Sequence, residues 1–273
     1  MLGAEYDYAV VGHVVVDVDA ETGSRSPGGT ALYSGLQAAR LGSRTLVITA
    51  GDPDELQALL APYAGEFDLI VQARTSTTTF LTSGVGLERM QRRTEWAGEM
   101  EDPGPIASPI MHVAPVAHET RAIRAGSGTF VGVTPQGLIR RWDADGAPAY
   151  VALDPALMPP RFDALVLDVV ERTYCASLVD AAATAGIAVA VTAGADGVEL
   201  VNDGTQLPAI EPVTVAEDLG AGDVFSAAFF IALHERRDPI AAAQLGQQAA
   251  AIRLAGRGPG AVGWRGQIYS GSS

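Results

Sequence analysis

The residues from Glu217 to Phe230, EDLGAGDVFSAAFF, place three small residues and a carboxylate where a strongly apolar helix begins. Gly220, Ala221 and Gly222 leave their backbone N–H groups open to an approaching ligand, and the helix behind them adds the positive end of its dipole. This turn could therefore hold an anion such as a phosphoryl group without any basic side chain. Asp223, which follows directly, could accept the proton of a hydroxyl group on a second molecule.

Asp223 also has a purely structural interpretation, because aspartate is a preferred residue at the N-cap of a helix. The two roles are compatible in space, although a carboxylate fully engaged as a cap is less free to react. The rest of the chain has to decide between them.

The absence of lysine excludes several kinds of chemistry. All 18 basic residues are arginine. A P-loop enzyme needs the lysine of GxxxxGK[ST], a protein kinase needs a lysine on one of its strands, and Schiff-base chemistry needs a lysine amine. These classes are therefore ruled out.

Composition narrows the choice of partners. The net charge of −14 argues against nucleic acid or an anionic membrane as a partner, because both bind clustered basic residues. The single cysteine, Cys175, permits no internal disulfide, and the four histidines lack the spacing of a metal site. No apolar run is long enough to cross a bilayer. We expect a cytoplasmic protein that acts on a small molecule, with a homodimer among the open options for its assembly.

The elements that must position the turn alternate between strands and helices. We predict a buried strand over 6–18, a helix over 29–42 and a strand over 44–49. Short connections of this kind favour a parallel sheet. The alternation resumes after the middle of the chain and ends with helices over about 223–236 and 239–255.

The middle of the chain departs from this alternation. Residues 75–85 and 90–96 are half-polar strands joined by a short turn, which is typical of a small lid rather than a core hairpin. No linker or repeat divides the sequence. We predict a single domain over 1–273, with a β lid formed mainly by about 75–97 and part of 12–27 as a candidate addition.

In an open α/β sheet, ligands bind at the carboxyl ends of the strands. Asp168 follows an apolar strand, where a carboxylate is costly without a partner or a cation. Arg140 is either a solvated charge or a clamp for substrate or phosphate, since guanidinium fits phosphate geometry. The residues at predicted strand ends are Asp17, Gly28, Gly29, Gln136, Arg140, Asp168, Glu171, Gly194 and the turn from Gly220 to Asp223.

Four segments together resemble the ribokinase/PfkB carbohydrate kinase family. LGAGD is similar to the end of the family's DTTGAGD-type signature, and PGGTALYSGLQAARLG to its glycine pair and first helix. VTAGADG resembles the strand and turn on the nucleotide side, and GRGPGA the loop beside adenine. The resemblance covers nearly the whole chain. It implies an α/β fold, a ribokinase-like three-layer sandwich with a mostly parallel central sheet and a small β lid.

The resemblance also assigns roles. It implies that Asp223 is the catalytic base and that Gly220, Ala221 and Gly222 stabilise the transferring phosphoryl group. DVVE stands where the family usually has NxxE, so that Asp168 and Glu171 would organise Mg²⁺ through water. The implied substrate-binding residues are Asp17, Gly28, Gly29, Tyr33, Gln136 and Arg140, and the implied ATP-binding residues are Thr192, Gly194, Gly197 and Gly260.

The implied activity is ATP-dependent phosphorylation of a hydroxyl group on a small polyol or sugar. VVGHVVVD, STTTF, RMQRRTE and TPQGLIRRW resemble the myo-inositol kinase-like branch, which favours an inositol-like substrate. Two alternatives stay open. One is a nucleoside kinase, because Tyr33 or Phe80 could stack on a base. The other is a catalytically weak sugar-binding or regulatory homologue, because Asp218, Leu219 and Asp168 replace the family's usual residues.

Overall fold

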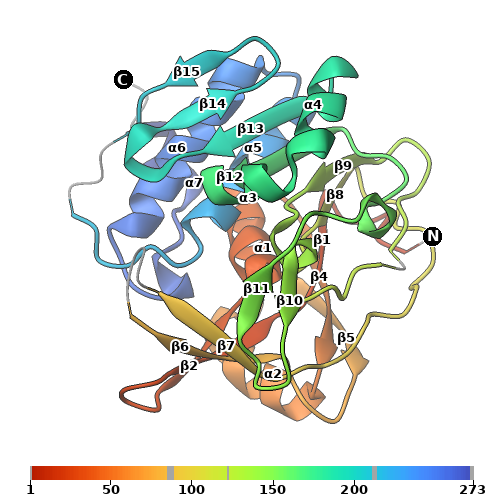
Figure 1. The fold of residues 1–273 in the computed structure, drawn as a ribbon, viewed down its shortest axis with the longest axis vertical. Helices are drawn as coiled ribbons and strands as arrows, with labels where there is room; N and C mark the ends of the chain where they lie inside the picture. Colours follow the sequence, from red (N-terminus) through yellow and green to blue (C-terminus); the bar gives the residue numbers. More distant parts are fainter. Residues whose placement is uncertain (1, 85–88, 122, 211–213, 271–273) are drawn as a thin grey trace.

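The computed structural model describes residues 2–84, 89–121, 123–210 and 214–270. Its central sheet has nine strands: β1 (Tyr8–Val11), β4 (Thr45–Gly51), β5 (Asp68–Ala73), β8 (Ile110–Val113), β9 (Phe130–Val133), β12 (Ala164–Asp168), β13 (Ala188–Thr192), β14 (Val198–Leu200) and β15 (Thr205–Leu207). Their order is β15-β14-β13-β12-β9-β8-β1-β4-β5 (Figure 1). The strands from β13 to β5 run parallel, and β14 and β15 are antiparallel at one edge.

Strand β1 shows why the strands of this sheet are continuous runs of apolar residues. Tyr8 and Val10 face one buried cluster, and Ala9 and Val11 face the other. A parallel strand that is covered on both faces needs apolar side chains at every position. The prediction of one strand over 6–18 is wrong at its centre: a Cβ at Gly12 would lie 2.1 Å from the carbonyl oxygen of residue 114, and the chain leaves the sheet at this close approach.

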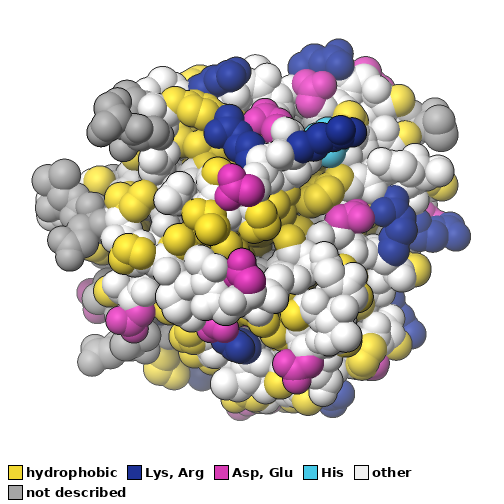
Figure 2. Space-filling model, turned by 90° about the horizontal axis from the view of Figure 1, so that it is seen from above, with side chains coloured by type: hydrophobic (Ala, Val, Ile, Leu, Met, Phe, Trp, Pro, Cys, Tyr) yellow, Lys and Arg dark blue, Asp and Glu magenta, His cyan; other side chains and the backbone are white. Residues whose placement is uncertain are grey.

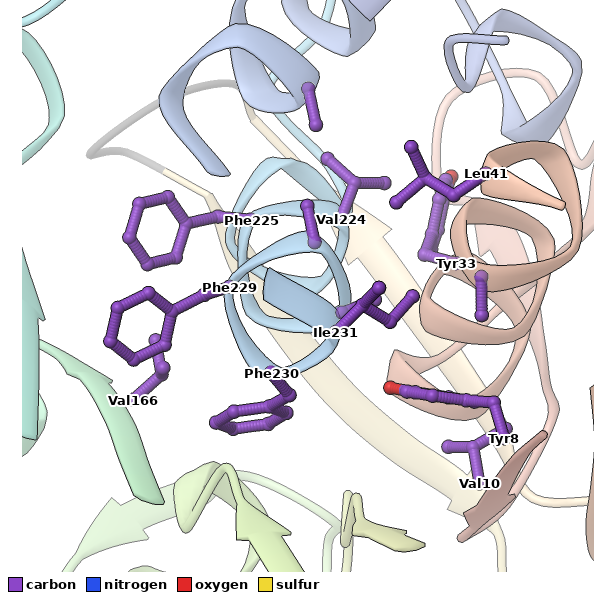
Figure 3. Packing of buried hydrophobic residues seen from close by; sticks show 14 of the residues in the cluster. Tyr8, Val10, Tyr33, Leu41, Val166, Val224, Phe225, Phe229, Phe230 and Ile231 are labelled. Atoms are coloured by element: carbon purple, nitrogen blue, oxygen red, sulfur yellow. The ribbon is translucent and has the colours of Figure 1, made fainter. Parts of the chain in front are cut away.

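Helices cover both faces of the sheet. Helix α5 lies against the middle of one face, and Figure 3 shows its Val224, Phe225 and Phe230 packed among residues of α1, β1 and β12. Helices α3 and α4 cover the opposite face. The helices are α1 (Thr30–Leu41), α2 (Pro53–Leu60), α3 (Val169–Tyr174), α4 (Ala176–Thr184), α5 (Ala221–His234), α6 (Pro239–Leu254) and α7 (Arg265–Ser270), with 3₁₀ turns η1 (Ala61–Tyr63), η3 (Gln136–Leu138), η4 (Pro155–Leu157), η5 (Gly194–Asp196) and η6 (Pro259–Ala261).

A second, four-stranded sheet lies at the lower end of the molecule in Figure 1, and we call it the lid sheet. It consists of β3 (Arg25–Gly28), β2 (Val15–Asp19), β6 (Thr79–Ser83) and β7 (Met90–Glu95), in that spatial order. The pair β2 and β6 is parallel, and the other pairs are antiparallel. Val85, the end of one predicted lid strand, lies outside the described residues.

A short antiparallel pair, β10 (Arg140–Trp142) and β11 (Pro148–Tyr150), lies beside the lid sheet. The rings of Phe80 and Trp142 join the two, with their centroids 5.2 Å apart. The predicted α/β class, with a mostly parallel sheet and a small β lid, is confirmed.

The surface carries charges of both signs. Figure 2 views one face of the molecule, on which arginine side chains lie beside acidic ones and hydrophobic side chains gather across the middle. Among the described helices, none has the length and apolar character needed to cross a membrane.

Candidate active site

The turn before α5 has the geometry of an anion-binding site. Gly220 is the N-cap residue and has a left-handed conformation, with φ of 80°. A Cβ at this position would lie 2.4 Å from the ring of Tyr33, so the turn is pressed directly onto α1. A Cβ at Gly222 would meet no described atom within 4 Å, which leaves the backbone of the turn open on that side. The N–H groups of the first helical turn can therefore approach a ligand closely.

Asp223 is not the cap of this helix. Helix α5 begins at Ala221, two residues earlier than the sequence predicted, so Asp223 is its third residue. In the part of the chain that the structure describes, no side chain caps this end of the helix. The interpretation of Asp223 as the N-cap is therefore wrong, and its carboxylate is not engaged in capping this helix.

Neighbouring groups tune the acidity of Asp223. Desolvation raises the pKa of this carboxyl to about 6, while a hydrogen bond from Thr30 and the charges of Arg140 and Arg253 lower it. The Ser34 hydroxyl donates to the backbone carbonyl of Asp223 at 3.1 Å and ties it to α1. A carboxylate with a pKa of about 6 is mostly ionised at neutral pH, yet basic enough to accept a proton from a hydroxyl group.

A buried arginine braces the turn from behind. Arg253 on α6 is fully buried, pairs with Glu217 and lies 5.1 Å above the ring centroid of Tyr33. It also donates to the carbonyl of Gly256 at 3.0 Å, and Glu217 accepts from the N–H of Gly258 at 2.8 Å. A buried charge is tolerated only when it is paired and hydrogen-bonded. This network joins α1, the turn before α5 and the loop after α6.

The residues in place of the family's leading aspartate and threonines thus have partners. Glu217 pairs with Arg253, and Asp218 pairs with Arg89 at the start of lid strand β7. Leu219 packs against the main hydrophobic cluster. Contacts from distant parts of the chain explain all three residue types.

Asp17 of the lid sheet closely approaches Gly28 of the glycine pair Gly28 and Gly29. A Cβ at Gly28 would lie 1.9 Å from Oδ2 of Asp17, and one at Gly29 would lie 2.6 Å from the carbonyl oxygen of His13. Burial, with smaller contributions from the charges of Glu217 and Asp223, raises the pKa of Asp17 to about 7, while the charge of Arg89 and a hydrogen bond from Thr82 oppose this. The structure therefore brings the predicted substrate carboxylate and the predicted base into one electrostatic neighbourhood.

Asp168 and Glu171 form a capping box at the start of α3. Asp168 Oδ1 accepts from the N–H of Glu171 at 2.7 Å, and Glu171 Oε2 accepts from the N–H of Asp168 at 3.0 Å. Burial and the charge of Asp168 raise the pKa of Glu171 to about 7, and Arg140 opposes this. The capping box uses one oxygen of each carboxylate.

A cavity of about 370 Å³ adjoins the turn on the other side. The predicted nucleotide residues Thr192, Gly194 and Gly197 line it together with Asp218 and Gly222 of the turn. Its volume lies within the range of small-molecule pockets, and an apolar lining suits a flat base. Its apolar side chains include those of Val198, Ile210, Phe225, Ala250 and Leu254.

Two predicted site residues, Tyr33 and Gly260, have structural contacts in the described chain. Tyr33 is 1% exposed and supports the turn from behind rather than facing a substrate. Gly260 is not among the residues that line the cavity, and its carbonyl instead accepts from Arg40 at 3.0 Å. Gln136 is half-buried in η3. The charge of Arg140 lowers the pKa of Glu171 and that of Asp223.

Sequence reasoning missed Thr30, Arg89 and Arg253. Arg253 does leave a signal, because it is an isolated charge in the otherwise apolar stretch AAAIRLAG. Arg89 and Thr30 have no comparable signal, since their partners are more than a hundred residues away.

Residues 169–264 match the family model described as pfkB family carbohydrate kinase. The search of curated proteins gave no match.

Several solved structures share the fold. A pyrophosphate-dependent kinase in the ribokinase family, in complex with a pyrophosphate analog and myo-inositol, is 16% identical with a TM-score of 0.72, over 96% of this chain and 99% of that one. Arabidopsis thaliana ribokinase, in complex with ribose and ATP, is 16% identical with a TM-score of 0.73, over 99% and 98%. A nucleoside kinase from Methanocaldococcus jannaschii is 15% identical with a TM-score of 0.76, over 98% of each chain. The chain thus has the ribokinase-like fold throughout, and its segment 169–264 matches the pfkB carbohydrate kinase family.

Proposed function

We propose that this protein is a kinase that transfers a phosphoryl group from ATP to a hydroxyl group of a small polyol or sugar. The observation that carries the proposal is the position of the turn before α5. Asp223 of this turn affects the pKa of Asp17, a buried carboxylate of the lid sheet, and Gly222 of the same turn lines the apolar cavity. An acceptor with hydroxyl groups fits the first side, and a nucleoside fits the second.

The proposed reaction uses the turn and Asp223 together. The acceptor hydroxyl gives its proton to the Asp223 carboxylate while its oxygen forms a bond to the γ-phosphorus. The bond from that phosphorus to the β–γ bridging oxygen breaks, and ADP leaves. The amides of Gly220 and Gly222 donate hydrogen bonds to the oxygens on which charge develops, whereas the Ala221 N–H donates to the carbonyl of Asp218 at 3.3 Å. Stabilisation of this developing charge lowers most of the barrier in phosphoryl transfer.

Magnesium fits the carboxylates at the start of α3 only as a water-mediated partner. Mg²⁺ keeps several of its waters and takes one or two carboxylates together with substrate phosphates. Asp168 and Glu171 could hold such waters with the oxygens that lie outside the capping box. When bound, the ion would neutralise negative charge on the phosphates. In the described chain, no cluster of three His, Cys, Asp or Glu residues could hold a metal by itself.

The cavity beside Gly222 supports a nucleoside triphosphate as the phosphoryl donor. One structural relative is described as pyrophosphate-dependent, whereas another was solved with ATP. Pyrophosphate has no apolar part and would leave the cavity beside Gly222 empty, but a nucleoside triphosphate places its base there. This supports ATP as the donor.

For the acceptor, an inositol-like polyol is favoured over a nucleoside. The relative solved with myo-inositol supports the first. The aromatic side chains that could stack on a base are not free: Phe80 is 3% exposed and packs on Trp142, and Tyr33 is buried behind the turn. We retain a nucleoside kinase and a catalytically weak sugar-binding homologue as outcomes of the test below.

The test is an ADP-release assay over inositols, hexoses, ketoses and nucleosides, with ATP or pyrophosphate as donor. We expect saturable, acceptor-dependent ADP release with a polyol or sugar. Turnover with nucleosides alone would change the acceptor class, and turnover with pyrophosphate alone would change the donor. Binding of a polyol without ADP release under any condition would contradict the kinase proposal.

A further inference from the structure

Asp218 places a negative charge where a polyphosphate has to lie. It lines the cavity beside Gly222 and comes two residues before Gly220, the N-cap of α5. Like charges at this range repel each other, and the repulsion is stronger where protein excludes water. A donor that binds the turn must therefore bind next to this carboxylate, unless a cation neutralises it.

The cation next to Asp218 belongs to the lid sheet. Arg89 immediately precedes β7, and its guanidinium pairs with the Asp218 carboxylate across the space between the lid sheet and α5. The side chains of Arg89 and Asp218 are 20% and 37% exposed, respectively. Both groups could thus be solvated separately if the lid sheet moved away.

The neighbouring ion pair has a different character. Glu217 pairs with Arg253, which has no exposed surface and comes from α6 in the same helical layer as α5. Separating this pair would leave a buried charge uncompensated, so it is a permanent brace. Of the two carboxylates that precede the turn, Glu217 has a partner on helix α6, and Asp218 has a partner next to strand β7 of the lid sheet.

Arg89 also acts on the acceptor side. Its positive charge lowers the pKa of Asp17, which lies on β2 of the same lid sheet. Strand β2 pairs with β6, and β6 pairs with β7, so the lid sheet links the strand that carries Asp17 to the strand that Arg89 immediately precedes. An acceptor that fixes the lid sheet through Asp17 would also fix Arg89 over Asp218.

We propose that Arg89 is a positioning residue that makes the donor site electrostatically competent: it neutralises Asp218 when the lid sheet lies over the turn, and so links donor binding to acceptor binding. This inference rests on the proposed kinase function. It assigns Asp218 the role of a carboxylate that weakens donor binding until the acceptor is in place. ATP would then be protected from hydrolysis when no acceptor is bound.

The test is a double-mutant cycle on the full chain, with Arg89→Gln, Asp218→Asn and both changes together. We expect Arg89→Gln to raise the KM for ATP about fivefold, the size expected for a partly exposed pair. In the Asp218→Asn background, Arg89→Gln should change that KM less than twofold, roughly, because no charge remains to be neutralised. Asp218→Asn alone should strengthen ATP binding in the absence of acceptor, as measured by calorimetry.

Arg92→Gln is the matched control: Arg92 is exposed on β7, the strand that Arg89 precedes, and its replacement should leave the KM for ATP unchanged. Thermal denaturation of each variant detects any folding defect, and Arg89→Lys, which keeps the charge, should recover part of the wild-type KM. An equal effect of Arg89→Gln with and without Asp218 would overturn the inference, because Arg89 would then act on the donor directly. Wild-type turnover in the same assay tests the kinase function separately.

Discussion

Replacement of Gly220 by alanine tests the geometry of the turn before α5 most sharply. The residue has φ of 80°, and an added Cβ would lie 2.4 Å from the Tyr33 ring. The left-handed conformation costs a residue with a side chain about 1–2 kcal/mol. Forcing an extra methyl group into a packed site costs about 1–3 kcal/mol more. We therefore expect Gly220→Ala to lower the free energy of unfolding by about 2–5 kcal/mol in total.

Thermal denaturation and steady-state kinetics measure the two consequences. For a chain of this size, the predicted loss corresponds to a fall in Tm of about 4–20 °C. The kcat should fall as well, because the clash between the new Cβ and the Tyr33 ring can be relieved only if the turn shifts. Gly222→Ala is the control, since its Cβ would meet nothing within 4 Å and should leave Tm nearly unchanged. If Gly220→Ala kept the wild-type Tm and kcat, the described packing of the turn on α1 would be wrong.

Three further predictions concern the carboxylates. The kcat should fall about tenfold per pH unit below about pH 6, because protonated Asp223 cannot accept a proton; a flat profile down to about pH 5 would contradict its role as base. Arg253→Met should lower the free energy of unfolding, measured in urea, by about 3–5 kcal/mol, because it leaves Glu217 unpaired. The double variant with Glu217→Gln should recover much of the lost stability, and no recovery would refute the pairing. Asp17→Asn should raise the KM for the acceptor about 10- to 100-fold and leave the KM for ATP nearly unchanged. A change in the KM for ATP alone would place Asp17 at the donor site instead.

Much of the framework could be predicted from sequence because local rules determine it. The helix over 29–42 ends at a left-handed Gly42, as α1 does in the structure. The half-polar stretches at 75–85 and 90–96 correspond to β6 and β7 of the lid sheet. Alternating burial and glycine chemistry are properties of neighbouring residues, so that a single sequence is sufficient to detect them.

The parts that could not be predicted depend on contacts between distant residues. The break after Val11 arises from a close approach to residue 114, and the start of α5 at Ala221 arises where Gly220 packs on another helix. The arginine partners of Glu217 and Asp218 lie 36 and 129 residues away, respectively. No local rule connects such residues, and this is why Glu217 and Asp218 look like departures from a signature in the sequence alone.

The central claim is that Asp223 takes the proton of the acceptor in a phosphoryl transfer from ATP. Its most direct test compares wild-type protein with Asp223→Asn, measuring ADP release with a saturating acceptor and binding of acceptor and ATP by calorimetry. We predict that kcat falls by about 100-fold or more, while both dissociation constants stay within about threefold of wild type. Turnover by Asp223→Asn at the wild-type rate would contradict this assignment.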